Sequence, residues 1–299
     1  MNQWYTDYAE YLQRFFPGVK VQKISVNIGA GCPNRDGTIG HGGCIYCNNT
    51  SFTPSYCFDV KGVSEQLEAG KRFFARKYPA MQYLAYFQSY TNTYRMDAAE
   101  LERIYREALS TKGVVGLIIG TRPDCIPPEV VEMLSRLNQE RPVFVELGVE
   151  TLCDETLRLI NRGHDSDRSR EAIRTLAAAG LHVGVHLIAG LPGEDEERVM
   201  QTVSEICSLP VESIKLHHLQ VLRDTPLHHM WVEKSVNITP YDPERYLELC
   251  RRIVKTVPRH IAIERFLASA PPALVVAPKW GLKNYEFTNL LINKLKEHE

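Results

Sequence analysis

The sequence predicts an α/β protein built as a partial (β/α)6 barrel. Short apolar runs rich in β-branched residues alternate with amphipathic stretches along most of the 299 residues. We count six such runs, each followed by a helical pattern. This alternation favours a parallel sheet with right-handed crossovers. The runs are apolar on both sides, as strands of a covered parallel sheet are. Six units rather than the eight of a closed barrel leave the barrel open.

The elements follow in order along the chain. The expected strands are Val21–Ile28, Tyr83–Gln88, Val115–Thr121, Phe144–Glu150, His182–Ile188 and Ser213–Val221. The expected helices between and after them are Val63–Arg76, Ala98–Ser110, Pro128–Asn138, Arg168–Ala179, Glu194–Cys207 and Pro243–Lys255. Prolines 271, 272 and 278 interrupt the coil that follows. We therefore expect a barrel with an N-terminal cysteine loop over residues 1–270. Residues 271–299 would form a C-terminal appendage packed on it, with a helix at Tyr285–Lys296.

The composition is that of an ordinary globular protein, with 44% hydrophobic and 24% charged residues. A net charge of −1 excludes a strong overall attraction to nucleic acid or membrane. The charge is uneven, however. Residues 245–299 hold ten Lys and Arg against five Asp and Glu, an excess of +5 that leaves −6 elsewhere. Neither a signal peptide nor an apolar run of membrane length is visible, so we expect a cytoplasmic protein with reduced cysteines and no membrane partner.

Three cysteines follow the first expected strand in the segment Cys32-Pro-Asn-Arg-Asp-Gly-Thr-Ile-Gly-His-Gly-Gly-Cys44-Ile-Tyr-Cys47. Cys44 and Cys47 can bind one metal centre from a tight turn, and the Gly-rich loop brings Cys32 back to the same centre. Three thiolates suit a [4Fe–4S] cubane with one iron left open. A structural zinc site with Cys57 as fourth thiolate is the alternative, and the cysteines alone leave both open. The other four are scattered and are expected in the core: Cys125, Cys153, Cys207 and Cys250.

Several further stretches resemble known radical S-adenosylmethionine (SAM) enzymes. Four resemble the radical SAM domain of the Elongator catalytic subunit and, more distantly, oxygen-independent coproporphyrinogen oxidase: Thr121-Arg-Pro-Asp124, Leu147-Gly-Val-Glu-Thr151, Asn161-Arg-Gly-His164 and His186-Leu-Ile-Ala-Gly-Leu-Pro-Gly193. Over its whole length the chain is similar to the smaller YhcC/YtqA-type radical SAM family. The long cysteine loop, Tyr90-Thr-Asn-Thr-Tyr94 and Pro278-Lys-Trp280 recur together there.

This resemblance implies a TIM-type partial barrel with two cofactors, a [4Fe–4S] cluster on Cys32, Cys44 and Cys47, and SAM on the open iron. An electron from a donor such as flavodoxin or ferredoxin would then cleave SAM to a 5′-deoxyadenosyl radical that abstracts hydrogen. Tyr46, directly before the last cysteine, is an aromatic residue typical of the family. The loop between the first two cysteines is longer here than the usual spacing.

The resemblance also assigns SAM contacts, all at the carboxyl ends of strands. Glu150 would face the ribose, and Arg162 would pair with the SAM carboxylate. The amino group would be held by Gln88, Ser89, Tyr90 and Thr91, and the ribose and adenine by His186 and Ile188. Two positions depart from the pattern. Gly120 replaces a glutamate that is common before Thr-Arg-Pro-Asp, and Gln88-Ser89 replaces a Gly-Gly pair. Taken singly, Glu150 and Arg162 fit an ordinary surface ion pair equally well.

No residue is assigned to the chemical step, and the candidates are Tyr94, Asp124 and His217. His217 and His218 are neighbours on one expected strand, so their side chains point to opposite faces. At most one of the two histidines faces the cavity.

The resemblance points to the wobble uridine of tRNA as substrate. Part of the family is thought to convert carboxymethylaminomethyl-uridine to aminomethyl-uridine, by hydrogen abstraction from the carboxymethyl group and its loss. From the basic segment we expect phosphate contacts by Arg251, Arg252, Lys279 and Lys283, with Trp280 nearer the base. Three alternatives stay open: a small-molecule or peptide substrate, a zinc-bearing nucleic-acid module, and a basic segment that is only a solvated surface.

Overall fold

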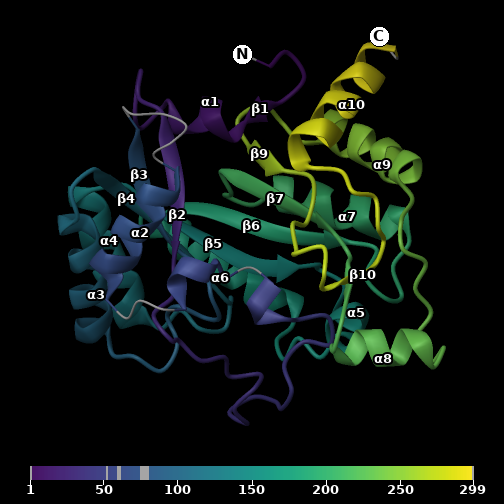
Figure 1. The fold of residues 1–299 in the computed structure, drawn as a ribbon, viewed down its shortest axis with the longest axis horizontal. Helices are drawn as coiled ribbons and strands as arrows, with labels where there is room; N and C mark the ends of the chain where they lie inside the picture. Colours follow the sequence, from purple (N-terminus) through teal and green to yellow (C-terminus); the bar gives the residue numbers. More distant parts are fainter. Residues whose placement is uncertain (1, 52, 59–61, 75–80, 298–299) are drawn as a thin grey trace.

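The computed structural model describes residues 2–51, 53–58, 62–74 and 81–297, and its centre is a curled parallel sheet (Figure 1). Eight strands lie in the order β1-β9-β7-β6-β5-β4-β3-β2. Their bounds are β1 Thr6–Asp7, β2 Val21–Val26, β3 Gln82–Phe87, β4 Val114–Thr121, β5 Val143–Glu150, β6 His182–Ala189, β7 Ser213–His218 and β9 Ala262–Arg265. A separate antiparallel ribbon pairs β8 (Val221–Leu222) with β10 (Val275–Ala277).

Helices follow most of the strands. They are α1 Tyr8–Leu12, α2 Val63–Phe74, α3 Ala98–Ser110, α4 Pro128–Glu140, α5 Asp154–Leu159, α6 Ser166–Ala178, α7 Glu196–Cys207, α8 Pro226–Val232, α9 Pro243–Thr256 and α10 Asn284–Glu297, with 3₁₀ turns at Asn49–Ser51 and Ser55–Cys57. Four of the longer helices begin at an aspartate whose side chain accepts a backbone N–H of the first turn: Asp97, Asp165, Asp195 and Asp242. Such a cap stabilises a helix by about 1 kcal/mol.

The predicted partial barrel is confirmed, and two short strands extend it. β9 pairs with β7, and β1 pairs with β9 at the edge. The predicted strand Ser213–Val221 divides into β7 and β8, and α1, α5 and α8 were not predicted. The predicted helix beginning at Val63 ends at Phe74, and its last expected residue, Arg76, lies outside the described residues.

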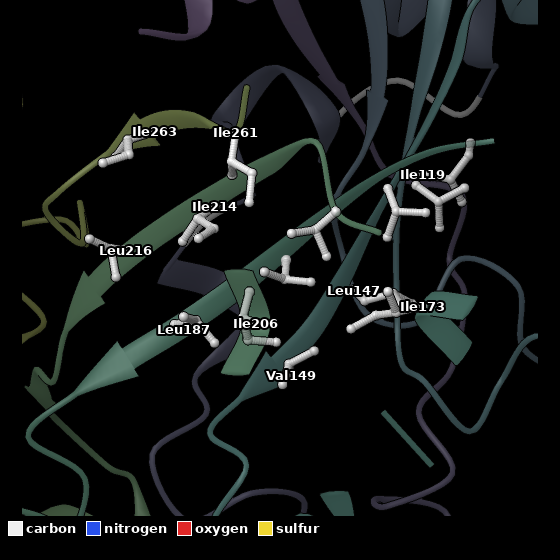
Figure 2. Close-up of a cluster of buried hydrophobic side chains, with 14 of the residues drawn as sticks. Ile119, Leu147, Val149, Ile173, Leu187, Ile206, Ile214, Leu216, Ile261 and Ile263 are labelled. Atoms are coloured by element: carbon white, nitrogen blue, oxygen red, sulfur yellow. The ribbon is translucent and has the colours of Figure 1, made fainter. Parts of the chain in front are cut away.

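The main hydrophobic core lies between the sheet and the helices on its outer face. Alternate residues of a strand point to opposite faces, so each strand gives one set of apolar side chains to this layer. Figure 2 shows Ile119, Leu147, Leu187 and Leu216, which come from β4, β5, β6 and β7 in turn. They pack in one cluster with Ile173 of α6 and Ile206 of α7. Burial stabilises the fold by about 1.5–3 kcal/mol for each side chain of this size.

The inner face of the curled sheet is closed at one end by the N-terminal segment. Tyr11, Leu12 and Phe16 pack there against apolar residues that include Leu84 and Phe144. These strand residues precede the carboxyl ends of β3 and β5. The inner face is therefore filled at the amino ends of the strands, and any site on it lies toward their carboxyl ends.

The C-terminal segment is part of the same core. α10 lies beside α9 (Figure 1), and Phe287, Leu291 and Leu295 are buried in the main cluster. The division of the chain at residue 270 remains a prediction. Within the described part of the chain, no helix is both long and apolar enough to cross a membrane.

Candidate active site

A cavity of about 380 Å³ lies on the inner face, at the carboxyl ends of the central strands. This is the size of an ordinary cofactor or ligand pocket, and barrel enzymes place their sites at this end. Its walls include Cys32, Cys44 and Cys47, which lie in the loop after β2. The three thiols of the predicted metal site therefore meet in one cavity.

Hydrogen-bond donors surround the cysteine loop. The amide of Asn34 lies 3.7 Å from the Cys44 sulfur, and its Nδ2 also donates to the Asn161 carbonyl. Arg35 donates to the carbonyl oxygen of Cys47 at 2.9 Å. Burial, followed by the neighbouring Cys44, raises the pKa of the Cys47 thiol to about 11. Donors directed at sulfur stabilise negative charge, so this environment fits an anionic metal–sulfur group.

Arg162 lies at the centre of this arrangement. Its Nη1 is 3.5 Å from the Cys44 sulfur, and its Nη2 donates to the carbonyl of Gly148 and lies 3.5 Å from Glu150 Oε1. The Nε atom is buried without a partner among the described residues. A Cβ at position 148 would lie 2.7 Å from Nη2, so the guanidinium occupies this place only because residue 148 is glycine.

Glu150 has a left-handed backbone with φ of 68°, at a break in the register between β5 and β6. Non-glycine residues held in this conformation cluster at functional sites, because the surrounding structure must compensate the strain. The irregularity turns the Glu150 side chain into the cavity, beside Arg162.

A buried ionic network forms the floor of the cavity. Glu146 of β5 accepts from Lys23 at 2.8 Å, Lys215 at 2.9 Å and the Tyr86 hydroxyl at 2.7 Å. Burial alone would raise the pKa of the Glu146 carboxyl, but Lys215 and Lys23 hold it well below its usual range. Glu264 of β9 binds the same two lysines, at 2.6 Å and 3.0 Å. The network ties β2, β3, β5, β7 and β9 together across the inner face.

Two histidines stand above this network. His186 Nε2 lies 2.7 Å from Glu146, and burial, followed by Lys215, lowers the pKa of His186. The imidazole therefore donates its Nε2–H to the carboxylate as the neutral ring. The His217 ring lies 5.6 Å from that of His186, and its Nε2 is 3.5 Å from Arg265 Nη2. His218 borders the cavity as well, although at most one of the two histidines was expected there, and its ring is stacked 4.3 Å from Trp280.

Residues 26–206 match the Radical SAM superfamily, and residues 211–297 match its C-terminal domain family. The chain belongs to the radical SAM superfamily. Protein YhcC of Escherichia coli is 36% identical over 282 residues, covering 94% of this chain and 89% of YhcC. The predicted membership of the YhcC/YtqA-type group is confirmed. Enzymes of this superfamily use a [4Fe–4S] cluster and SAM, which are therefore the cofactors of this enzyme.

Two further similar proteins are longer, and this chain matches only part of each. A tRNA uridine(34) acetyltransferase of Methanocaldococcus jannaschii is 28% identical over 207 residues, which are 68% of this chain and 37% of that protein. The structure of Elp3 from Methanocaldococcus infernus superposes with a TM-score of 0.71 at 19% identity. It covers 94% of this chain, which spans 63% of the length of that structure. At this identity the superposition shows a shared fold.

The residues fit the two cofactors of the superfamily. The donors around Cys44 and the unpartnered Nε of Arg162 suit an anionic cluster and a ligand carboxylate. Among the described residues, no group of three or more His, Cys, Asp and Glu side chains is placed to hold a single metal ion. Cys57 does not join the other three thiols, because its sulfur donates to the Ser25 carbonyl at 3.4 Å. The geometry thus gives no support to the four-thiolate zinc site.

Most of the predicted SAM contacts line the cavity, and one does not. Tyr46, Gln88, Tyr90, Thr91, Glu150, Arg162, His186 and Ile188 all line it. Ser89 is the exception, since its buried hydroxyl lies 2.9 Å from that of Thr53. The hydroxyl of Ser89 is thus engaged away from the cavity, and the expected contact of Ser89 with SAM stays a prediction. Gly120 stands where the family commonly has a glutamate. A Cβ at this position would lie 3.0 Å from the Phe87 carbonyl, so β3 and β4 approach closely here.

Two of the three catalytic candidates, Tyr94 and Asp124, do not line the cavity among the described residues, and their catalytic role stays a prediction. Asp124 accepts from Arg122 Nε and Nη2 at 2.8 and 2.7 Å, and Arg122 donates to the Arg162 carbonyl at 2.8 Å. Asp124 therefore positions the turn that carries Arg162. The Tyr94 hydroxyl lies 2.6 Å from Thr38 Oγ1 and so holds the cysteine loop. His217 is the candidate that lines the cavity.

Sequence reasoning missed the floor of the cavity. Glu146, Lys215 and Lys23 are charged residues inside apolar strands, a signal that marks an inward-facing polar surface. Glu146 and Glu150 are an even number of residues apart on one strand, as are Lys215 and His217. That spacing places the members of each pair on the same face and was enough to group them.

Proposed function

We propose that this radical SAM enzyme modifies the wobble uridine of tRNA, converting carboxymethylaminomethyl-uridine to aminomethyl-uridine. The supporting observation is its similarity to a tRNA uridine(34) acetyltransferase, 28% identical over 207 residues. A cytoplasmic location and a flavodoxin or ferredoxin as electron donor belong to the same proposal.

The proposal assigns roles to the residues of the cavity. Cys32, Cys44 and Cys47 hold the cluster, and Arg162 takes the SAM carboxylate. When both cofactors are bound, they supply a radical that abstracts hydrogen from the substrate. Glu150 faces the SAM ribose, while the network around Glu146 fixes the strands that form the floor. The remaining contacts to SAM come from Tyr46, Gln88, Tyr90, Thr91, His186 and Ile188.

A nucleoside profile of tRNA from a deletion strain tests the substrate. Carboxymethylaminomethyl-uridine should accumulate and aminomethyl-uridine should fall when the gene is absent. The wild-type gene should restore the profile, and a Cys44→Ala variant should not. An unchanged profile would overturn the tRNA assignment and favour a small-molecule or peptide substrate, which the nearly neutral net charge of −1 also suits.

A further inference from the structure

The cavity has two chemically different ends. One end carries the three cysteines, which follow β2, together with Arg162. The other end is formed by His217 of β7, Arg265 of β9 and residues 268–270. The two ends contact different parts of the sheet: Cys44 lies 3.5 Å from Arg162, which follows β5, whereas His217 and Arg265 come from the neighbouring strands β7 and β9.

The carboxylates near Arg265 are already engaged. Glu146 binds Lys23 and Lys215, and Glu264 binds the same two lysines. Three cations, the two lysines and Arg265, thus face two carboxylates on this part of the inner surface, which leaves one positive charge in excess. His217 adds no further positive charge, because burial, followed by Arg265, holds its pKa well below the usual value and keeps the ring neutral.

Arg265 itself has free donors. Within the described part of the chain it forms no ion pair, and its one side-chain contact is the 3.5 Å approach of Nη2 to His217 Nε2. Its Nε is buried and has no hydrogen-bond partner. A buried donor left unsatisfied costs about 1–3 kcal/mol, more when it is charged. The Nε and terminal nitrogens of a guanidinium form a planar fork that matches a carboxylate.

We propose that Arg265 binds a carboxylate of the substrate at this end of the cavity, beside His217. The inference rests on the proposed function, in which that carboxylate belongs to the carboxymethyl group to be removed. A substrate held by this group has its charged end at Arg265, away from the cysteines. The product lacks the carboxylate and leaves the guanidinium without its partner. The site therefore selects substrate over product.

Binding of two matched RNAs tests the site. Anticodon stem-loops with carboxymethylaminomethyl-uridine or aminomethyl-uridine at the wobble position are titrated against the SAM-loaded holoenzyme without oxygen, and fluorescence anisotropy gives each Kd. Wild type should prefer the carboxylated RNA by about 10–100-fold, the worth of a charged hydrogen bond. Arg265→Met should abolish this preference, and Arg265→Lys should retain part of it. Arg141→Met, which removes an exposed arginine after α4, should keep the wild-type preference.

The outcomes separate the inference from the proposed function. If wild type discriminates between the RNAs and Arg265→Met discriminates equally, the carboxylate site is wrong while the tRNA assignment stands. A loss of SAM affinity in Arg265→Met as large as in Arg162→Ala would assign Arg265 to the cofactor and overturn the inference as well. Equal binding of both RNAs by wild type would overturn the carboxylate site. If wild type binds neither RNA, the proposed function fails and the site is tested alone. Calorimetry with N-methylglycine, succinate and their uncharged amides should then show binding of the acids only, lost in Arg265→Met. No binding of either acid would overturn the site.

Discussion

Arg162 lies between the cysteine loop and Glu150 and contacts both through single atoms. One terminal nitrogen approaches the Cys44 sulfur at 3.5 Å, the other passes over Gly148, and the Nε has no partner within the described residues. The Arg122–Asp124 ion pair fixes the turn that carries Arg162, because Arg122 donates a hydrogen bond to the Arg162 carbonyl. Such second contacts hold a binding group in one orientation before its ligand arrives.

Replacement of Arg162 by alanine should weaken SAM binding. The lost charged hydrogen bond is worth roughly 1.5–3 kcal/mol, which corresponds to about a 10–100-fold increase in Kd. Calorimetry on the cluster-loaded protein measures it. Arg158→Ala, an exposed residue of α5, serves as the control and should bind SAM like wild type. Equal affinity in Arg162→Ala and wild type would place the SAM carboxylate elsewhere.

The cysteines give a second test of the site. Cys32→Ala, Cys44→Ala and Cys47→Ala should each lose the cluster, because a cubane with one open iron needs all three thiolates. Cys57→Ala should keep it, since that sulfur is bonded to the Ser25 carbonyl instead. Iron and sulfide content and visible absorption after anaerobic reconstitution report the result. Zinc in the native protein, lost in Cys57→Ala, is the result that contradicts the assignment.

Individual residues were predictable where a local motif carried them. The spacing of Cys44 and Cys47 is visible in the sequence, and the cavity contains both. The contacts of Ser89 and Asp124 could not be predicted, because only the folded chain shows that Thr53 and Arg122 occupy their polar groups. Arg265 was not singled out at all. Its lack of an ion pair among the described residues depends on how two distant lysines use Glu264, which no motif encodes.

Whole strands were predictable where they are long and apolar. β4 and β5 are almost entirely buried, and their β-branched runs are plain in the sequence. β9 has four residues, of which Glu264 and Arg265 are charged, so it lacks the apolar pattern of a covered strand. Glu264 faces the inner side of the sheet, where the lysines of β2 and β7 pair with it. Because its inward-facing residue is charged, β9 could not be recognised as a strand from an apolar pattern.

The strands on that inner face should depend on Glu146 for stability. Glu146→Gln removes the buried carboxylate between Lys23 and Lys215 and leaves the two cations with one carboxylate, Glu264, between them. Breaking a buried pair in this way costs about 3–5 kcal/mol. Urea unfolding followed by circular dichroism measures the change. Glu140→Gln, which loses an exposed pair with Arg106, should leave the unfolding midpoint unchanged. Full stability of Glu146→Gln would mean that Glu264 alone compensates both lysines.

At the scale of the whole molecule, ion pairs neutralise two of the four basic residues that were expected to contact phosphates. Arg251 pairs with Glu248 on its own helix, and Arg252 pairs with Glu197 of α7. Trp280 is also occupied, since its ring lies between His218 and Phe287 and its indole N–H donates to the Tyr241 carbonyl at 2.9 Å. The expectation that Trp280 lies near the base stays a prediction, and these contacts leave the ring little freedom to stack on one.

Two of the four residues that were predicted to contact phosphates are exposed to solvent. Lys279 and Lys283 are exposed and form no ion pair within the described residues. They follow β10, which pairs with β8 directly after the carboxyl end of β7. They therefore lie on the segment that leaves the end of the sheet where the cavity opens. A tRNA whose wobble base enters the cavity would bring its anticodon phosphates to this side.

Binding of tRNA should accordingly depend on Lys279 and Lys283 and not on the paired arginines. The double variant Lys279→Gln/Lys283→Gln should weaken binding and lower the slope of log K against log salt by about one unit per lost contact, because each phosphate contact releases counterions. Arg251→Gln/Arg252→Gln removes the same total charge, but those guanidiniums are already neutralised by glutamates, so its slope should match wild type. Filter binding between low and physiological salt measures both. An equal loss in the two double variants would mean that binding follows total charge rather than position. In that case the segment after β10 does not contact the anticodon, and the phosphate contacts have to be sought on another surface.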